Sequence, residues 1–68
     1  MNTATTTQAT PCLLRLPDVQ RITSLSRSTI YDLMQKGAFP KQRPIKHSRS
    51  VVWDAQAVRN WVDEVLAA

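Results

Sequence analysis

A run of basic residues that no acid interrupts is the first sign of chemistry in this sequence. No Asp or Glu lies between Asp32 and Asp54. The same stretch contains five cations: Lys36, Lys41, Arg43, Lys46 and Arg49. A neutral solvated surface normally mixes both signs of charge, whereas clustered ammonium and guanidinium groups suit phosphates. With a net charge of +4 for the whole chain, the expected partner is a nucleic acid, although an acidic protein surface would also be attracted.

The residue types that catalysis requires are scarce. The chain has one histidine, His47, one cysteine, Cys12, one glycine and scattered carboxylates. They provide no nucleophile and base pair, no set of zinc ligands and no glycine-rich phosphate loop. We therefore expect no enzyme, no metal, no cofactor and no small-molecule substrate. A single cysteine also excludes an internal disulfide, which fits a reducing cytoplasm.

A second group of polar side chains follows helical spacing. Ser26 suits the N-cap of a helix that begins at Arg27. At 100° per residue, Ile30, Leu33 and Met34 then share one side of this helix. The other hydrogen-bonding side chains suit base edges and phosphates. These candidate DNA-binding residues are Arg27, Ser28, Thr29, Tyr31 and Gln35.

Position along the helix separates these candidates. Side chains near the start of such a helix usually enter a DNA groove, which favours Arg27 and Ser28. Tyr31 is expected to reach a phosphate through its hydroxyl. Asp32 would be repelled by phosphate, and we expect it at the edge of the face, orienting Arg27, Ser28 or Lys36.

A shorter helix precedes this one and packs against it. Pro17 suits the first turn of a helix from Pro17 to Thr23, in which Val19 and Ile22 share a face. Two short helices joined by a tight turn form a helix-turn-helix, a common way to place a helix in a DNA groove. Gly37 predicts a left-handed cap at the end of the second helix, and Pro40 prevents that helix from resuming.

Residues Lys41 to Trp53 change to the spacing of a hairpin. Ile45, then Val51 and Trp53, predict two strands with these apolar side chains turned inward. The basic residues from the end of the second helix onward are expected to contact the DNA backbone or minor groove. They are Lys36, Lys41, Arg43, Lys46, His47 and Arg49. Arg49 is the strongest candidate among them, because a guanidinium suits a narrow groove. His47 is expected either to contact a phosphate or to be an ordinary solvated surface residue.

A third helix is expected from Ala55 to about Leu66, capped by Asp54. Its apolar stripe consists of Val58, Trp61, Val62, Val65 and Leu66. We expect this stripe to supply the larger part of the core, with Trp61 as its largest contribution. Both tryptophans lie at core positions, which disfavours them as stacking platforms for single-stranded bases.

The segments LLRLPDV, SLSRSTIYDLMQKGAFP and VVWDAQAVRNWV, together with the basic hairpin around Arg49, resemble the AlpA family of prophage regulators. These small proteins are similar to phage excisionases and to the DNA-binding domain of MerR-type regulators. The resemblance covers about Leu13 to Val65. It implies a winged helix-turn-helix that binds DNA near a phage attachment site or an integrase promoter and acts in transcription, in excision or in both. Relatives often carry glycines where this chain has His47 and Ser48, which predicts a longer or looser hairpin tip.

The fold class expected is mainly α with a small β-hairpin, in one domain over residues 12–68. Residues 1–11 are Thr-rich and uncharged, and we expect a flexible tail there. They contain no apolar run suited to a signal peptide or membrane span, so we expect no membrane association and a cytoplasmic location.

Two functions of different classes fit these features. The first is sequence-specific binding of double-stranded DNA, for transcriptional regulation, of an integrase gene for example, or for excision. The alternative is a protein-interaction module whose basic face binds an acidic regulator or an integrase, with DNA binding secondary. A polar helix face beside a positive hairpin favours the first. Further partners expected are an integrase, RNA polymerase and neighbouring copies of the chain on DNA.

Overall fold

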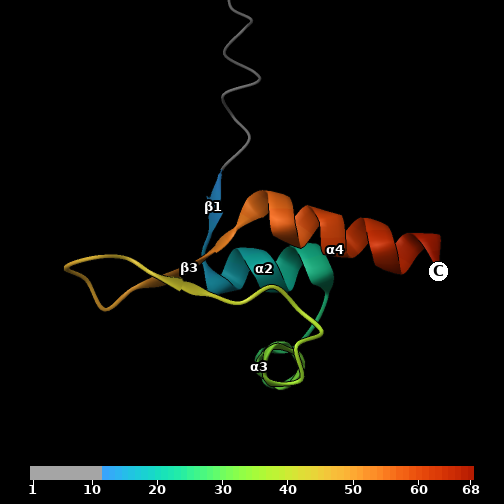
Figure 1. Ribbon diagram of the computed structural model, residues 1–68, viewed down its shortest axis with the longest axis horizontal. Helices are drawn as coiled ribbons and strands as arrows, with labels where there is room; N and C mark the ends of the chain where they lie inside the picture. Colours follow the sequence, from blue (N-terminus) through green and yellow to red (C-terminus); the bar gives the residue numbers. More distant parts are fainter. Residues whose placement is uncertain (1–11) are drawn as a thin grey trace, which may run out of the picture.

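Three helices and three short strands make up residues 12–68, the part of the chain that the computed structural model describes (Figure 1). In chain order they are β1 (Leu13–Leu14), α2 (Leu16–Thr23), α3 (Arg27–Gln35), β2 (Arg43–Pro44), β3 (Val51–Asp54) and α4 (Ala55–Ala67). The predicted class, mainly helical with a small antiparallel sheet, is confirmed. The tail predicted for residues 1–11 lies outside the described residues.

Local signals set the ends of the helices. The Ser26 hydroxyl caps α3 by accepting from the Thr29 backbone N–H at 3.2 Å, and the Asp54 carboxylate caps α4 by accepting from the Gln56 N–H at 3.0 Å. At the other end of α3, Gly37 has a φ of +74°. The N–H groups of Gly37 and Ala38 then donate to the carbonyls of Met34 and Leu33 at 3.1 and 2.8 Å, which completes a Schellman cap.

The sheet has one strand more than the predicted hairpin. Its order is β1-β3-β2, and both pairings are antiparallel. Leu14 lies opposite Trp53 on one side of β3, and Pro44 lies opposite Val51 on the other. Pro44 is compatible with this place because β2 is an edge strand. The two residues of β1 are too few to show the alternation that identifies a strand, which is why the sequence did not predict it.

The core forms where the sheet meets the helices. Its buried members are Leu14, Val19, Ile30, Phe39, Trp53, Ala55 and Val58. Trp53 has no exposed surface and its indole N–H donates to the Pro40 carbonyl at 3.1 Å. This hydrogen bond matters because a buried indole N–H without an acceptor would destabilise the fold. Trp53, and not Trp61, is therefore the largest contribution to the core.

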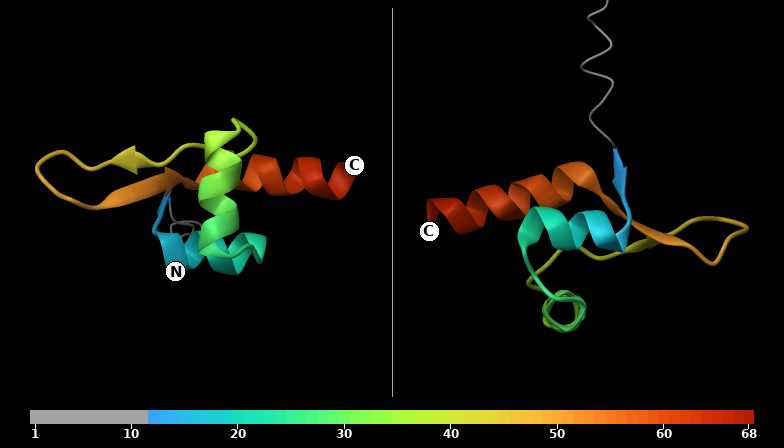
Figure 2. Two further views of the ribbon diagram at one scale, coloured as in Figure 1. Left: turned by 90° about the horizontal axis from the view of Figure 1, so that it is seen from below. Right: turned by 180° about the vertical axis from the view of Figure 1, so that it is seen from behind.

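The prediction that the stripe of α4 supplies the larger part of the core was wrong, because Val58 is the one member of the stripe that is buried in the described structure. Val65 and Leu66 are 51% and 78% exposed, and Trp61 is only half-buried. Figure 1, and the view from behind in Figure 2, show α4 continuing past the end of the short helix α2, so α2 does not cover its last turns. Two other residues that were predicted to face the core are also exposed. Ile22 is 43% exposed at the end of α2, and Ile45 is 37% exposed on the projecting hairpin.

We expect Trp53→Ala to lower the free energy of unfolding by about 3–5 kcal/mol, the usual cost of deleting a fully buried aromatic side chain. Urea denaturation measures this. Trp61→Ala should cost clearly less because that ring is partly solvated. If Trp53→Ala does not fold, Trp53→Phe takes its place in the comparison, and its cost should still exceed that of Trp61→Ala. Equal costs for the two alanine variants would contradict this account of the core.

Candidate nucleic-acid interface

Positive charge is concentrated on α3 and the segment that follows it. Six of the nine Lys and Arg residues, but one of the five acids, lie between Ser26 and Trp53. Within residues 12–68, ion pairs join only Asp18 with Arg21 at 3.1 Å and Asp32 with Lys36 at 2.9 Å. Between Ser26 and Trp53, five exposed cations are thus left without an acidic partner in the described structure: Arg27, Lys41, Arg43, Lys46 and Arg49.

Helix α3 stands out from one side of the molecule, with α2 behind it and α4 on the far side (Figures 1 and 2). Arg27 and Ser28 are exposed in its first turn, and Gln35 is exposed in its last. Thr29 is also exposed, but its hydroxyl lies 2.9 Å from that of Ser26, as part of the cap. The start of α3 therefore presents the two leading candidates to solvent.

Asp32 lies where the sequence placed it, at the edge of this face. Of the three partners considered for it, Lys36 is the one it contacts. Both side chains of this pair are more than half exposed, so the pair contributes little to stability. Lys36 is consequently free to exchange Asp32 for a phosphate.

Tyr31 joins α3 to the segment before the hairpin. Its ring is half-buried and meets the Trp53 ring edge-on, with 6.5 Å between centroids. Its hydroxyl donates to the side-chain oxygen of Gln42 at 3.3 Å, and the Arg27 guanidinium lies 5.6 Å from the centre of its ring. The cation–π contact holds Arg27 beside Tyr31 at the surface of α3.

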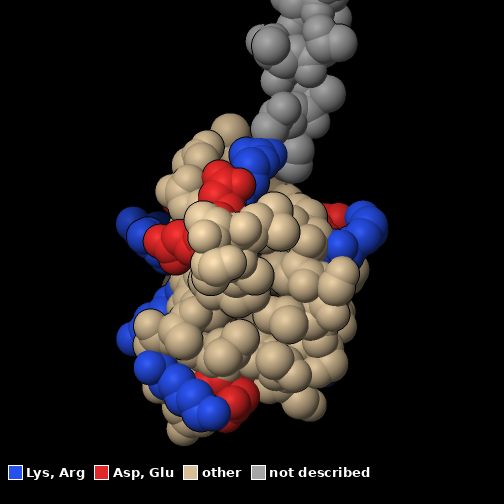
Figure 3. All heavy atoms as spheres, turned by 90° about the vertical axis from the view of Figure 1, so that its right-hand side faces the viewer, with Lys and Arg blue, Asp and Glu red and all other residues tan. Residues whose placement is uncertain are grey.

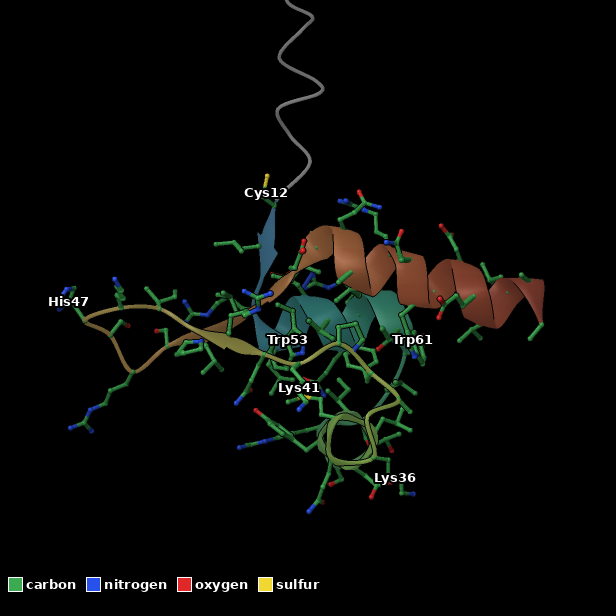
Figure 4. All side chains as sticks on the ribbon, viewed as in Figure 1. Cys12, Lys36, Lys41, His47, Trp53 and Trp61 are labelled. Atoms are coloured by element: carbon green, nitrogen blue, oxygen red, sulfur yellow. The ribbon has the colours of Figure 1, made fainter. Side chains whose placement is uncertain are left out.

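We call residues 38–42 the linker, because they connect the cap of α3 to β2. Three side chains hold it: Trp61 donates to the Ala38 carbonyl at 2.9 Å, Trp53 donates to the Pro40 carbonyl and Tyr31 donates to Gln42. Lys41 lies between the last two attachments, on the side of the molecule where α3 lies (Figure 4). The linker therefore holds Lys41 beside α3.

Sequence reasoning missed Gln42. This half-buried side chain lines an open groove beside α3 together with Tyr31, Met34, Gln35 and Lys41. No pattern in the sequence indicates a structural contact for this glutamine, which lies between two cations, Lys41 and Arg43. The contact of Arg27 with Tyr31 could have been found, because side chains four positions apart on a helix are neighbours.

The hairpin comprises residues 43–54. Its loop end projects away from the core, whereas Val52 and Trp53 on β3 are buried. Its six-residue loop, Ile45–Ser50, begins with a turn closed by the Ser48 N–H donating to the Ile45 carbonyl at 3.1 Å. His47 has a φ of +63° in this turn, a conformation in which glycine is usual. The looser tip predicted from the missing glycines is thus found only in part: the loop is long, but its turn is closed.

The predicted contact residues form two groups. Arg27, Ser28, Thr29, Tyr31, Gln35, Lys36 and Lys41 lie on α3 or beside it, whereas Lys46, His47 and Arg49 lie at the tip of the hairpin, with Arg43 on β2 between them. Figure 4 shows His47 at one extreme of the molecule, well separated from Lys36 and Lys41. A linear polyanion is the kind of ligand that can reach both groups.

Three helices, a small antiparallel sheet and this charge distribution are compatible with a small DNA-binding domain. The family described as Prophage CP4-57 regulatory protein (AlpA) matches residues 12–66, and the chain belongs to this AlpA family of prophage regulatory proteins. The resemblance seen in the motifs is thereby confirmed.

Among curated proteins, the uncharacterized protein ORF88 of Enterobacteria phage P4 is 43% identical over 49 residues, or 72% of this chain and 54% of that protein. The chain spans about half the length of that relative. No solved structure matches the chain. Across residues 12–68, none of the helices combines the length and the apolar character needed to cross a membrane.

We expect His47→Gly to raise the free energy of unfolding by up to about 1 kcal/mol, because relief of the left-handed conformation outweighs the added freedom of the unfolded chain. For a domain of this size, thermal denaturation should show a rise of roughly 4–8 °C per kcal/mol. Ser48→Gly is the matched control. Ser48 does not have a positive φ, and its hydroxyl accepts from the Ser50 N–H at 3.0 Å, so that variant should be less stable than the parent.

Proposed function

We propose that the chain is a winged helix-turn-helix protein that binds a specific site on double-stranded DNA. In this proposal α3 enters the major groove, with Arg27, Ser28 and Gln35 facing base edges. The hairpin is the wing, and Lys46, His47 and Arg49 at its tip contact the backbone or the adjacent minor groove. Thr29, Tyr31, Lys36, Lys41 and Arg43 contact phosphates between these two regions.

The observation that carries this proposal is the presence of unpaired cations on both a projecting helix and a projecting hairpin. Two extensions from one small body, with Lys41 and Arg43 between them, suit a groove together with its flanking backbone. A flat acidic protein surface would require neither extension. The second candidate function, an interaction module for an acidic regulator, is therefore less well supported.

Duplex DNA is favoured over single-stranded nucleic acid by the state of the two tryptophans. Trp53 is fully buried, and Trp61 is half-buried with its indole N–H bonded to Ala38. Its ring packs edge-on against Phe39, with 5.0 Å between centroids. Neither ring is presented as the open platform on which unpaired bases stack.

Membership of a prophage regulatory family supports a role on phage DNA. We propose that the chain regulates transcription, of an integrase gene for example, assists excision, or does both. RNA polymerase and an integrase are the corresponding protein partners. Footprinting on DNA that flanks its own coding region would identify the site and indicate which activity follows from its position.

The dependence of affinity on salt tests the phosphate contacts. If the five cations proposed to contact the backbone each neutralise one phosphate, log affinity against log salt should have a slope of about −4 to −5, from roughly −0.9 per contact. These cations are Lys36, Lys41, Arg43, Lys46 and Arg49. Fluorescence anisotropy with a labelled duplex at several salt concentrations measures this slope. A slope near zero would contradict binding of DNA through this surface.

Two substitutions separate reading of the sequence from attachment to the backbone. Ser28→Ala should lower the preference for the footprinted site over random DNA, since the hydroxyl is proposed to face base edges. Lys46→Ala should weaken binding to both duplexes by similar factors and reduce the salt slope by about 1. Competition between the two duplexes measures both effects. If both substitutions changed specificity equally, the proposed reading face would be wrong.

A further inference from the structure

The C-terminal turns of α4 have a chemistry unlike the rest of the molecule. Val65 and Leu66 are exposed, and Asp63 and Glu64 beside them are exposed without a basic partner in the described structure. No Lys or Arg follows Arg59. This end is therefore apolar and acidic on a chain whose net charge is positive, and an exposed apolar surface of this kind is a candidate contact site.

The apolar surface continues into a groove beside the linker. Phe39, Pro40, Ala57, Asn60, Trp61 and Glu64 line this open groove of about 480 Å³. Figure 3 views the molecule from the end where α4 terminates, and shows a broad surface without charged side chains, bordered by charged ones. We call the groove together with Val65 and Leu66 the α4 site.

The matching chemistry lies at the opposite end of the same molecule. Pro44 and Ile45 are exposed on the hairpin, and Lys46 follows them, so the hairpin offers apolar side chains next to a free cation. Figure 1 shows the hairpin and the end of α4 pointing in opposite directions. These two surfaces cannot meet within one copy, but they can meet between successive copies.

We propose that the α4 site receives the hairpin of a second copy of this chain when both are bound to neighbouring sites on DNA. Ile45 of one copy packs on the exposed apolar side chains at the end of α4, which places the basic hairpin beside Glu64. This inference rests on the proposed DNA binding and adds the surface through which copies contact one another. The contact is head-to-tail, so it leaves an open array in which further copies can be added.

The contact is weak by itself. A hairpin tip on one helix end covers far less than the 1,200 Å² or so of a stable standard-size interface, so the chain should remain monomeric in dilute solution. On DNA, a neighbouring copy is present at an effective concentration in the millimolar range, which is enough for a weak contact to form. Self-association should therefore appear as cooperative binding to DNA.

Cross-linking tests the geometry. In a Cys12→Ser background, one preparation carries Ile45→Cys and the other carries Leu66→Cys, and the two are mixed with a short bis-maleimide, with and without a long duplex. The expected product joins position 45 of one copy to position 66 of the other, and increases with DNA. A product that joins two copies at position 66 would show symmetric pairing of α4 and overturn the proposal, as would the absence of the mixed product in both conditions.

Binding to duplexes of two lengths tests the energetics. The parent should bind each site of a long duplex about tenfold more tightly than a short duplex that holds one copy, equivalent to about 1.4 kcal/mol per contact. Glu64→Lys should abolish this ratio. Asp18→Lys, with the same change of charge on α2, should preserve it.

The outcomes separate this inference from the proposed function. Tight binding to the short duplex with no gain on the long one would leave DNA binding intact and overturn the contact between copies. An equal loss of the ratio in Asp18→Lys would overturn it too, because general charge would then explain the effect. Failure to bind the short duplex would instead contradict the proposed function, and cross-linking without DNA would then decide the contact.

Discussion

The structure depends on the complete burial of Trp53 and on the contacts that its ring makes. Trp53 lies on the central strand opposite Leu14, its ring faces Tyr31 of α3 and its indole N–H holds the carbonyl of Pro40. One side chain thus joins the first strand, the projecting helix and the linker. A domain of this size buries only about 60% of the surface of its unfolded chain, so few side chains can take part in so many contacts.

The elements that could be predicted from the sequence are those with local causes. Ser26, Gly37 and Asp54 mark helix ends because capping involves only neighbouring residues, and all three act as expected. The extent of the core could not be predicted in this way. Helical spacing shows which residues share a face of α4, but whether Leu66 is covered depends on where α2 ends in space, which no local pattern contains.

The same distinction applies to the candidate interface. The sequence indicated which residues are polar and basic, and the structure leaves those residues accessible on α3 and the hairpin. It did not indicate how far apart the helix group and the hairpin group lie, because that depends on how far the hairpin projects. It also missed Gln42, whose contact with Tyr31 joins residues eleven positions apart. DNA contact by these residues remains a prediction.

Strand β3 runs into α4 without a loop, since Asp54 is both the last residue of the strand and the cap of the helix. This junction makes the two elements one mechanical unit. One residue inserted after Asp54 would rotate the face of α4 by about 100° and advance it by about 1.5 Å, removing Val58 from the core. Variation in chain length is therefore tolerable in the hairpin loop, where an added residue is solvated, and not here. The distance from the sheet to the exposed residues Val65 and Leu66 is consequently a fixed length in this fold, set by the number of helical residues between them.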